Sequence, residues 1–116
     1  MKPIFFIFVM LLSTLSFSQS VSLDNIAAYE GKRVTIFEKV VSTYQSKGEK
    51  KTTYLNFGKP YPDALFSVVI FEASLKNFSY SPADYLKGKR VRITGVVKMY
   101  KGKPQFVITE EKDIEL

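Results

Sequence analysis

The fold is decided by the stretch Lys32–Tyr44, which reads K-R-V-T-I-F-E-K-V-V-S-T-Y. It is rich in β-branched residues and alternates in part between apolar and polar side chains, which is typical of a strand. The alternation is lost between Glu38 and Val41, and one extra residue at that point would account for the loss. The stretch therefore predicts one long strand with a bulge near its middle.

The opening of this strand recurs later in the chain. Gly31–Ile36 reads G-K-R-V-T-I, and Gly88–Ile93 reads G-K-R-V-R-I. Each copy follows a short helical segment that contains a tyrosine, and each leads into a long strand and a hairpin. Two copies do not make a repeat protein, which needs three or more stacked units. The echo instead predicts that the first and fourth strands have matching structural roles.

The segments around these two strands complete a pattern rich in strands. A charged turn at residues 45–51 leads into a second strand, Thr52–Phe57, whose Leu55 and Phe57 lie on the face opposite Tyr54 and Asn56. The other expected elements are an apolar strand at Leu65–Phe71, helical turns at Ala73–Phe78 and Ser81–Leu86, and strands at Gly88–Tyr100 and Gln105–Thr109. The pattern predicts an all-β protein with short helices and five strands.

Residues 1–18 are typical of a cleavable signal peptide. Lys2 supplies the positive charge, Ile4–Leu12 is an unbroken apolar run, and the small residues Ser16 and Ser18 precede the expected cut. The run is shorter than the roughly 20 residues that span a bilayer. We expect an exported protein, periplasmic or secreted, with a single domain at residues 19–116. Within it we expect a short helix at residues 22–29 and a solvated acidic tail at residues 110–116.

The composition limits the chemistry that the domain can perform. The chain has no cysteine and no histidine, so a disulfide framework, lipid attachment through a cysteine, a thiolate nucleophile and a histidine base are all missing. The strand carboxylates Glu38 and Glu72 are isolated in sequence. We predict a monomeric, non-catalytic protein with no metal, no cofactor and no stable membrane anchor after the signal peptide is removed.

The charge balance favours an anionic partner. Residues 19–109 carry 15 basic and 7 acidic side chains, a net charge of +8. Such an excess suits nucleic acid, an acidic polysaccharide or a membrane surface. The alternative is that the charge serves only solubility.

Two long strands, two hairpins and a helical insertion fit a small barrel better than a sandwich, because a closed sheet hides its edges. The region Gly31–Thr109 resembles the OB-fold, a five-stranded Greek-key barrel. More narrowly, the stretch Tyr54–Asp63, Y-L-N-F-G-K-P-Y-P-D, followed by the strand Phe66–Phe71, resembles OB-type nucleic-acid-binding domains that accompany secreted bacterial nucleases.

The resemblance implies a binding face on the second and third strands, flanked by the first hairpin loop and the loop between the fourth and fifth strands. Carried onto this sequence, it implicates Tyr44, Lys47, Lys50, Lys51, Tyr54, Asn56, Tyr100, Lys101 and Lys103. Aromatic rings stack on bases, and lysines follow the phosphates of a single strand. The expected function is binding of single-stranded or accessible nucleic acid with low sequence preference.

Three alternatives stay open at this point. The tyrosines could be ordinary strand residues that cover the barrel, the loop lysines could be solvated turn residues, and Tyr61 between two prolines could serve only to stiffen its loop. The same groove could also bind a protein or an acidic glycan of the cell envelope.

Overall fold

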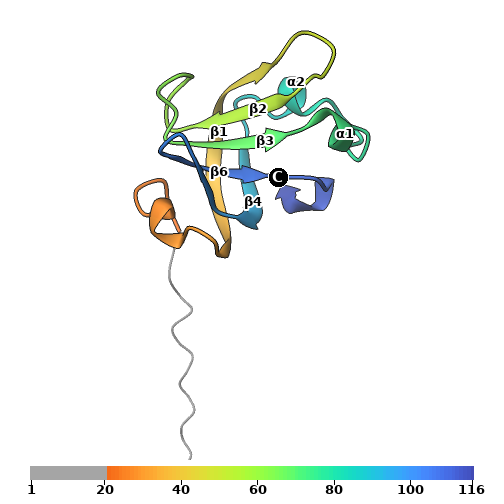
Figure 1. The fold of residues 1–116 in the computed structure, drawn as a ribbon. Coiled ribbons are helices and arrows are strands. Elements are labelled where there is room, and N and C mark those ends of the chain that lie inside the picture. The colour runs from red at the N-terminus through yellow and green to blue at the C-terminus, as the bar shows by residue number, and fades with distance from the viewer. Residues whose placement is uncertain (1–20) are drawn as a thin grey trace, which may run out of the picture.

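A computed structural model describes residues 21–116 of the chain. The predicted signal peptide, residues 1–18, and the expected mature terminus at Gln19 lie outside the described residues. The described part is a curled seven-stranded sheet with a few short helices, which confirms the prediction of an all-β protein (Figure 1). The elements are η2 Ile26–Tyr29, β1 Arg33–Gln45, β2 Thr53–Phe57, β3 Phe66–Ile70, α1 Glu72–Leu75, α2 Pro82–Tyr85, β4 Arg90–Val96, β5 Lys98–Tyr100, β6 Lys103–Val107, η3 Glu111–Asp113 and β7 Ile114–Glu115.

The hydrogen-bonded order of the strands is β5-β6-β3-β2-β1-β4-β7. β1 is antiparallel to both β2 and β4, and the predicted hairpins β1–β2 and β5–β6 are present. β3 and β6 run parallel to each other. Strands β2, β3 and β6 lie in front of β1 and β4 in Figure 1, and the core lies between these two groups.

The bulge predicted near the middle of β1 is present. Val40 is opposite Phe57 and Ser42 is opposite Asn56, so β1 advances two residues where β2 advances one. Before the bulge Ile36 and Val40 point into the core, and beyond it Ser42 and Tyr44 belong to the outer face. The bulge thus changes which residues of β1 face outward.

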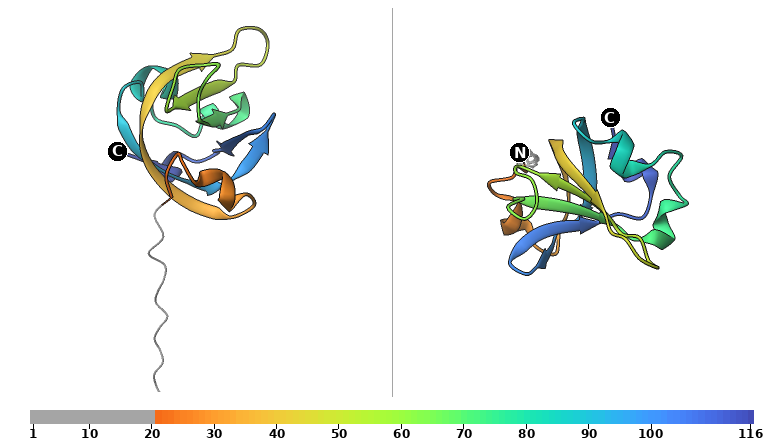
Figure 2. Two further views of the ribbon diagram at one scale, coloured as in Figure 1. Left: turned by 90° about the vertical axis from the view of Figure 1, so that its left-hand side faces the viewer. Right: turned by 90° about the horizontal axis from the view of Figure 1, so that it is seen from above.

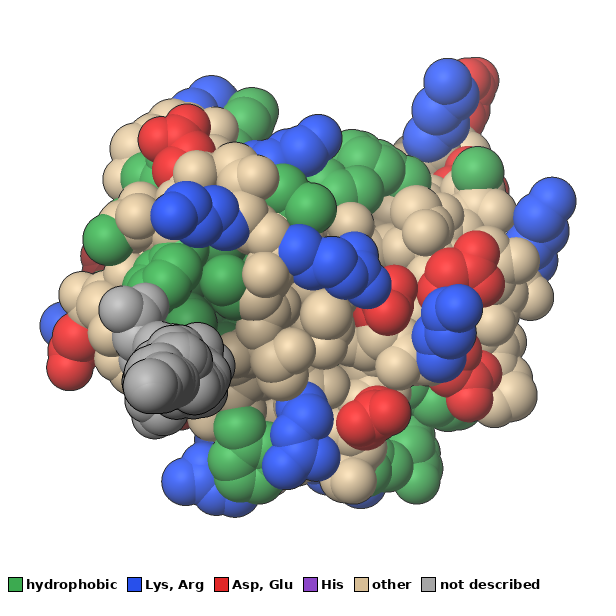
Figure 3. Space-filling view, turned by 90° about the horizontal axis from the view of Figure 1, so that it is seen from below, with side chains coloured by type: hydrophobic (Ala, Val, Ile, Leu, Met, Phe, Trp, Pro, Cys, Tyr) green, Lys and Arg blue, Asp and Glu red, His purple; other side chains and the backbone are tan. Residues whose placement is uncertain are grey.

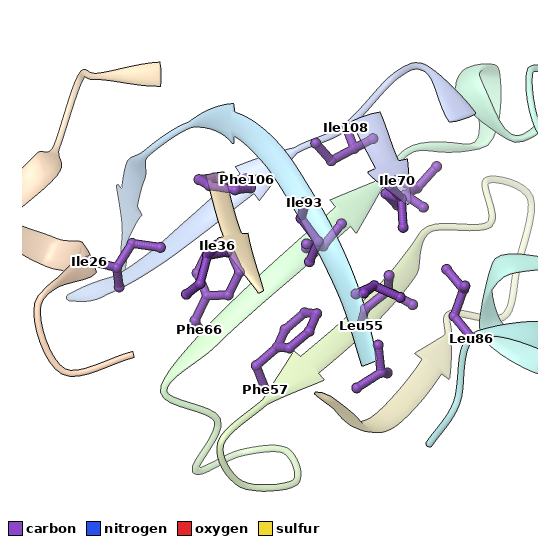
Figure 4. Close-up of a cluster of buried hydrophobic side chains, with 14 of the residues drawn as sticks. Ile26, Ile36, Leu55, Phe57, Phe66, Ile70, Leu86, Ile93, Phe106 and Ile108 are labelled. Carbon is purple, nitrogen blue, oxygen red and sulfur yellow. The ribbon is translucent and has the colours of Figure 1, made fainter. Parts of the chain in front are cut away.

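The sequence echo corresponds to a pair of strands at the centre of the core. Ile36 of β1 and Ile93 of β4 are directly opposite each other, and both side chains are buried (Figure 4). The glycines that open the two copies, Gly31 and Gly88, both have a positive φ, a conformation that glycine adopts without steric cost. The prediction of matching roles for these two strands is confirmed.

The predicted strand at Gly88–Tyr100 is in fact divided into β4 and β5. Val97 separates them, and its backbone N–H donates to the Lys32 carbonyl at 3.0 Å while its carbonyl accepts from the Gly31 N–H at 2.8 Å. Beyond this point the chain leaves β1 and pairs with β6. Because the side chain of Val97 is completely buried, the bend is fixed by the core.

The acidic tail is part of the fold, so the prediction of a solvated end at residues 110–116 is wrong. β7 pairs with β4, and Ile114 is buried opposite Ile93. Asp113 forms a 3.3 Å ion pair with Arg33, and Glu111 accepts a hydrogen bond from the backbone N–H of Ser79 at 2.6 Å. Among the charged residues of the tail, Ile114 is apolar and buried, and its burial holds the tail on the sheet. With the divided strand and β7, the predicted count of five strands becomes seven.

The short helices lie at the ends of the sheet, as two views of the ribbon show (Figure 2). The helix expected at residues 22–29 is shorter, a single 3-10 turn at Ile26–Tyr29 that buries Ile26. The two helical turns expected after the third strand are present as α1 and α2, and Pro82 opens α2 as predicted. Within residues 21–116, no helix has the length and apolar character needed to cross a membrane.

Candidate functional site

A groove of about 670 Å³ lies over the outer face of β2 and β3. Its walls come from the end of β1, from the β2–β3 loop and from the β5–β6 hairpin. The lining residues are Tyr44, Tyr54, Asn56, Tyr61, Pro62, Ala64, Ser67, Val69, Tyr100, Lys101, Lys103, Pro104 and Gln105. Six of the nine residues that the sequence predicted for the site therefore line one groove, and the three predicted tyrosines are among them.

Tyr44 and Tyr54 form an aromatic pair at one end of the groove. They are directly opposite each other on β1 and β2, with ring centroids 6.1 Å apart and planes inclined by 25°. Tyr44 is 54% exposed, and Tyr54 is half-buried. Cross-strand partners on one face are close enough for their rings to pack together. The register of the hairpin thus presents a flat aromatic surface to the groove.

Asn56 lies in the floor of the groove and is only 3% exposed. Its Nδ2 donates to Ser42 Oγ at 3.2 Å, and its Oδ1 accepts from Ser67 Oγ at 3.0 Å. These contacts tie three neighbouring strands together. The amide is therefore a positioning group for the floor, and its polar atoms are already occupied by protein.

The β5–β6 hairpin supplies the opposite wall. Lys101 and Gly102 both have positive φ, 51° and 80°, which fits a two-residue turn whose twist matches that of the flanking strands. Tyr100 is opposite Lys103 and is 57% exposed. Lys101 Nζ lies 5.4 Å from the centre of the Tyr100 ring.

Lys103 connects the hairpin to the β2–β3 loop, since its Nζ donates to the Pro62 carbonyl at 2.8 Å. This contact holds the ammonium group beside the groove. Tyr61, the residue before Pro62, is 79% exposed and also lines the groove. From the sequence, the one role suggested for Tyr61 was to stiffen its loop. An aromatic residue between two prolines was the sequence signal that could have added Tyr61 to the predicted site.

Lys47, Lys50 and Lys51, which the resemblance implicated in binding, do not line the groove. They are exposed in the loop beyond the last β1–β2 pair, Gln45 with Thr53. Ser46 closes this loop, because its Oγ accepts from the Thr52 N–H at 2.8 Å. Seen from above, the loop and the β5–β6 hairpin reach beyond opposite ends of the face formed by β2 and β3 (Figure 2).

The charge of the groove is of one sign. Its lining includes two lysines, and none of the described residues that line it is acidic. Elsewhere the charges are mixed: on the lower face Lys and Arg lie beside Asp and Glu (Figure 3). Within residues 21–116 no cluster of three or more histidine, cysteine or acidic side chains is placed to hold a metal ion.

Comparisons of the chain with protein-family models, with curated proteins and with solved structures find no match. The groove and its chemistry are therefore the basis on which a function is proposed.

Proposed function

We propose that the domain is an OB-type barrel that binds single-stranded nucleic acid across the face of β2 and β3, without catalysing a reaction. The strand pairing supports the barrel: β1 pairs with both β2 and β4, β3 is parallel to β6, and β4 continues after one residue into β5 at the other end of the sheet order. The bent stretch Arg90–Tyr100 thus lies next to β7 near one end of the sheet order and forms the other end as β5, as expected for a small barrel.

One observation carries the proposal: Tyr44, Tyr54 and Tyr100 line the same groove together with Lys101 and Lys103. Tyr44 and Tyr54 lie on the β1–β2 hairpin and the other three residues on the β5–β6 hairpin, and the fold brings these two distant hairpins together. Exposed rings offer surfaces on which bases stack, at roughly 1 to 3 kcal/mol per base, and the ammonium groups can neutralise phosphates. A groove without carboxylates adds no repulsion toward a polyanion.

The floor of the groove favours binding with little sequence preference. Reading a base requires free donors and acceptors that match its edge. The amide of Asn56 and the hydroxyl of Ser67 instead bond to each other at 3.0 Å. Stacking and phosphate contacts, which every base offers alike, are then the main source of affinity.

We propose that the protein acts outside the cytoplasm, in a periplasm or after secretion, because the signal-like residues 1–18 favour export. The second candidate is a module that holds an acidic glycan or an envelope protein in the same groove. The exposed rings of Tyr61 and Tyr100 favour this candidate as well, because flat apolar rings pack against many kinds of partner.

The test is a fluorescence anisotropy titration of labelled oligonucleotides with the purified protein at about 50 mM salt and above. We expect binding of single strands that weakens steeply as salt increases. Tyr54→Ala should weaken it, whereas Phe71→Ala, which removes an exposed ring outside the groove, should not. No binding at low salt, or equal effects of the two substitutions, would contradict the proposal. Binding of an acidic polysaccharide but not of oligonucleotides would support the second candidate.

A further inference from the structure

A second aromatic and basic cluster lies on the outer face of β1 and β4, outside the groove. Phe37 is 49% exposed, and the guanidinium carbons of Arg90 and Arg92 lie 5.5 Å and 5.4 Å from the centre of its ring. Phe37 is opposite Arg92, and Lys39 is opposite Arg90. This cluster, which we call the Phe37 patch, combines the same two chemical features as the groove, a ring and cations.

The charges of the Phe37 patch are poorly compensated within the protein. Among residues 21–116, Arg90 and Lys39 form no ion pair, and Arg92 reaches Glu115 only at 4.0 Å. Both partners of that pair are more than half exposed, and such pairs contribute little to stability. Arg90 and Arg92 beside the exposed ring, and Lys39 opposite Arg90, are therefore available to an external anion.

The bulge in β1 makes the patch continuous with the groove. Before the bulge the outward residues of β1 include Phe37 and Lys39, Val41 is exposed at the bulge, and beyond it Ser42 and Tyr44 face outward. Tyr44 lies seven positions after Phe37 in the sequence, which is about 23 Å along an extended strand. β1 is one long curved strand on the outside of the molecule (Figure 2), and its exposed residues Phe37, Lys39, Val41 and Tyr44 follow one another along it.

We propose that a single strand of nucleic acid bound in the groove leaves it over Tyr44 and continues along the outer face of β1 to the Phe37 patch. The inference rests on the proposed function, because it extends the same site. Phe37 would stack on a base, and Arg90 and Arg92 would contact the phosphates on either side of it. The site would then be longer than the groove alone.

The experiment compares oligonucleotides of about 6 and about 16 nucleotides, within the roughly 4 to 16 nucleotides that OB-folds occupy. Affinity for the long one is measured by anisotropy and for the short one by competition. Phe37→Ala should weaken binding of the long oligonucleotide at least about fivefold, the lower limit for one stacked base, and leave the short one unchanged. The double variant Arg90→Gln/Arg92→Gln should lower the salt slope for the long oligonucleotide by about 1.4, for two lost phosphate contacts.

The matched control is Lys76→Gln/Lys112→Gln, which removes the same charge from the end of α1 and from η3. It should leave the salt slope unchanged. Equal losses for long and short oligonucleotides, or an unchanged slope in the arginine variant, would overturn the extended path. Failure of the groove itself is distinguishable, because Tyr54→Ala would then leave binding of both oligonucleotides unaffected. Circular dichroism and urea unfolding establish that each variant is folded.

Discussion

The paired rings of Tyr44 and Tyr54 offer a quantitative test of the site. Their centroids are 6.1 Å apart and their planes differ by 25°, so the two rings stack on each other, and we expect a base to stack on this pair. Replacing either residue by alanine should cost about 1 to 3 kcal/mol of binding free energy, which is about a 5- to 140-fold loss of affinity. Because each ring supports the other, replacing both should cost little more than replacing one.

The assay is a double-mutant cycle in which anisotropy gives the affinity of the parent, both single variants and the double variant at one salt concentration. We expect a coupling energy of about 0.5 to 3 kcal/mol, as for residues in contact. Tyr100 provides the matched comparison, because β6 and β3 lie between its strand, β5, and the strand β2 in the sheet order. The effects of Tyr100→Ala and Tyr54→Ala should add. Additive losses for Tyr44 and Tyr54 would refute a shared stacking surface.

Four further predictions concern single residues. Lys103→Gln should lower the salt slope of single-strand binding by about 0.7, measured by titration at several salt concentrations, since one phosphate contact is lost. Ile114→Ala should lower the free energy of unfolding in urea by about 2 to 5 kcal/mol, because the side chain is buried where the tail joins the sheet. Gly95→Ala should cost about 1 to 3 kcal/mol in the same assay, as its new Cβ would lie 2.9 Å from the Phe106 ring. Burial raises the pKa of the Tyr80 hydroxyl, and the nearby Glu111 and Tyr85 raise it further. As pH rises, the unfolded chain therefore loses the Tyr80 proton at a lower pH than the folded protein does. Stability should therefore fall as pH rises above about 10, and Tyr80→Phe should reduce that fall.

The strands of this protein could be predicted from the sequence because their side chains alternate and their turns contain glycine and proline. The hairpin of β1 and β2, its bulge and the equivalence of β1 and β4 all followed from local patterns. The break at Val97 was not predicted, because Val97 and Lys98 continue the apolar and polar alternation of the expected strand. It arises when the chain changes partner from β1 to β6.

The acidic tail is a second element whose structure could not be predicted from its local composition. Four acids dominate the local composition of residues 110–116, and the position of Ile114 in the core depends on pairing with β4, which is distant in the sequence. Local charge therefore suggested solvation, whereas burial of one side chain decided the outcome.

For the candidate site, the sequence predicted the residues located on strands better than those in loops. Tyr54 lies on the regular strand β2, and Tyr44 and Tyr100 lie at or near the ends of their strands, where strand pairing fixes the side that each ring faces. The direction of Lys47 depends on the path of an irregular loop, for which residue type alone gives no direction. Tyr61 was undervalued for the same reason.

The bulge in β1 connects the fold to the proposed site. Because side chains alternate along a strand, a β1 without the extra residue could not keep both Val40 in the core and Tyr44 on the outer face in its present pairing with β2. Tyr44 is four positions after Val40, an even number, so regular alternation would place both on one side. The extra residue reverses the alternation between them. The bulge, visible in the sequence as a loss of alternation, therefore turns Tyr44 toward Tyr54. It also places Phe37 and Tyr44 on the same outer face of β1.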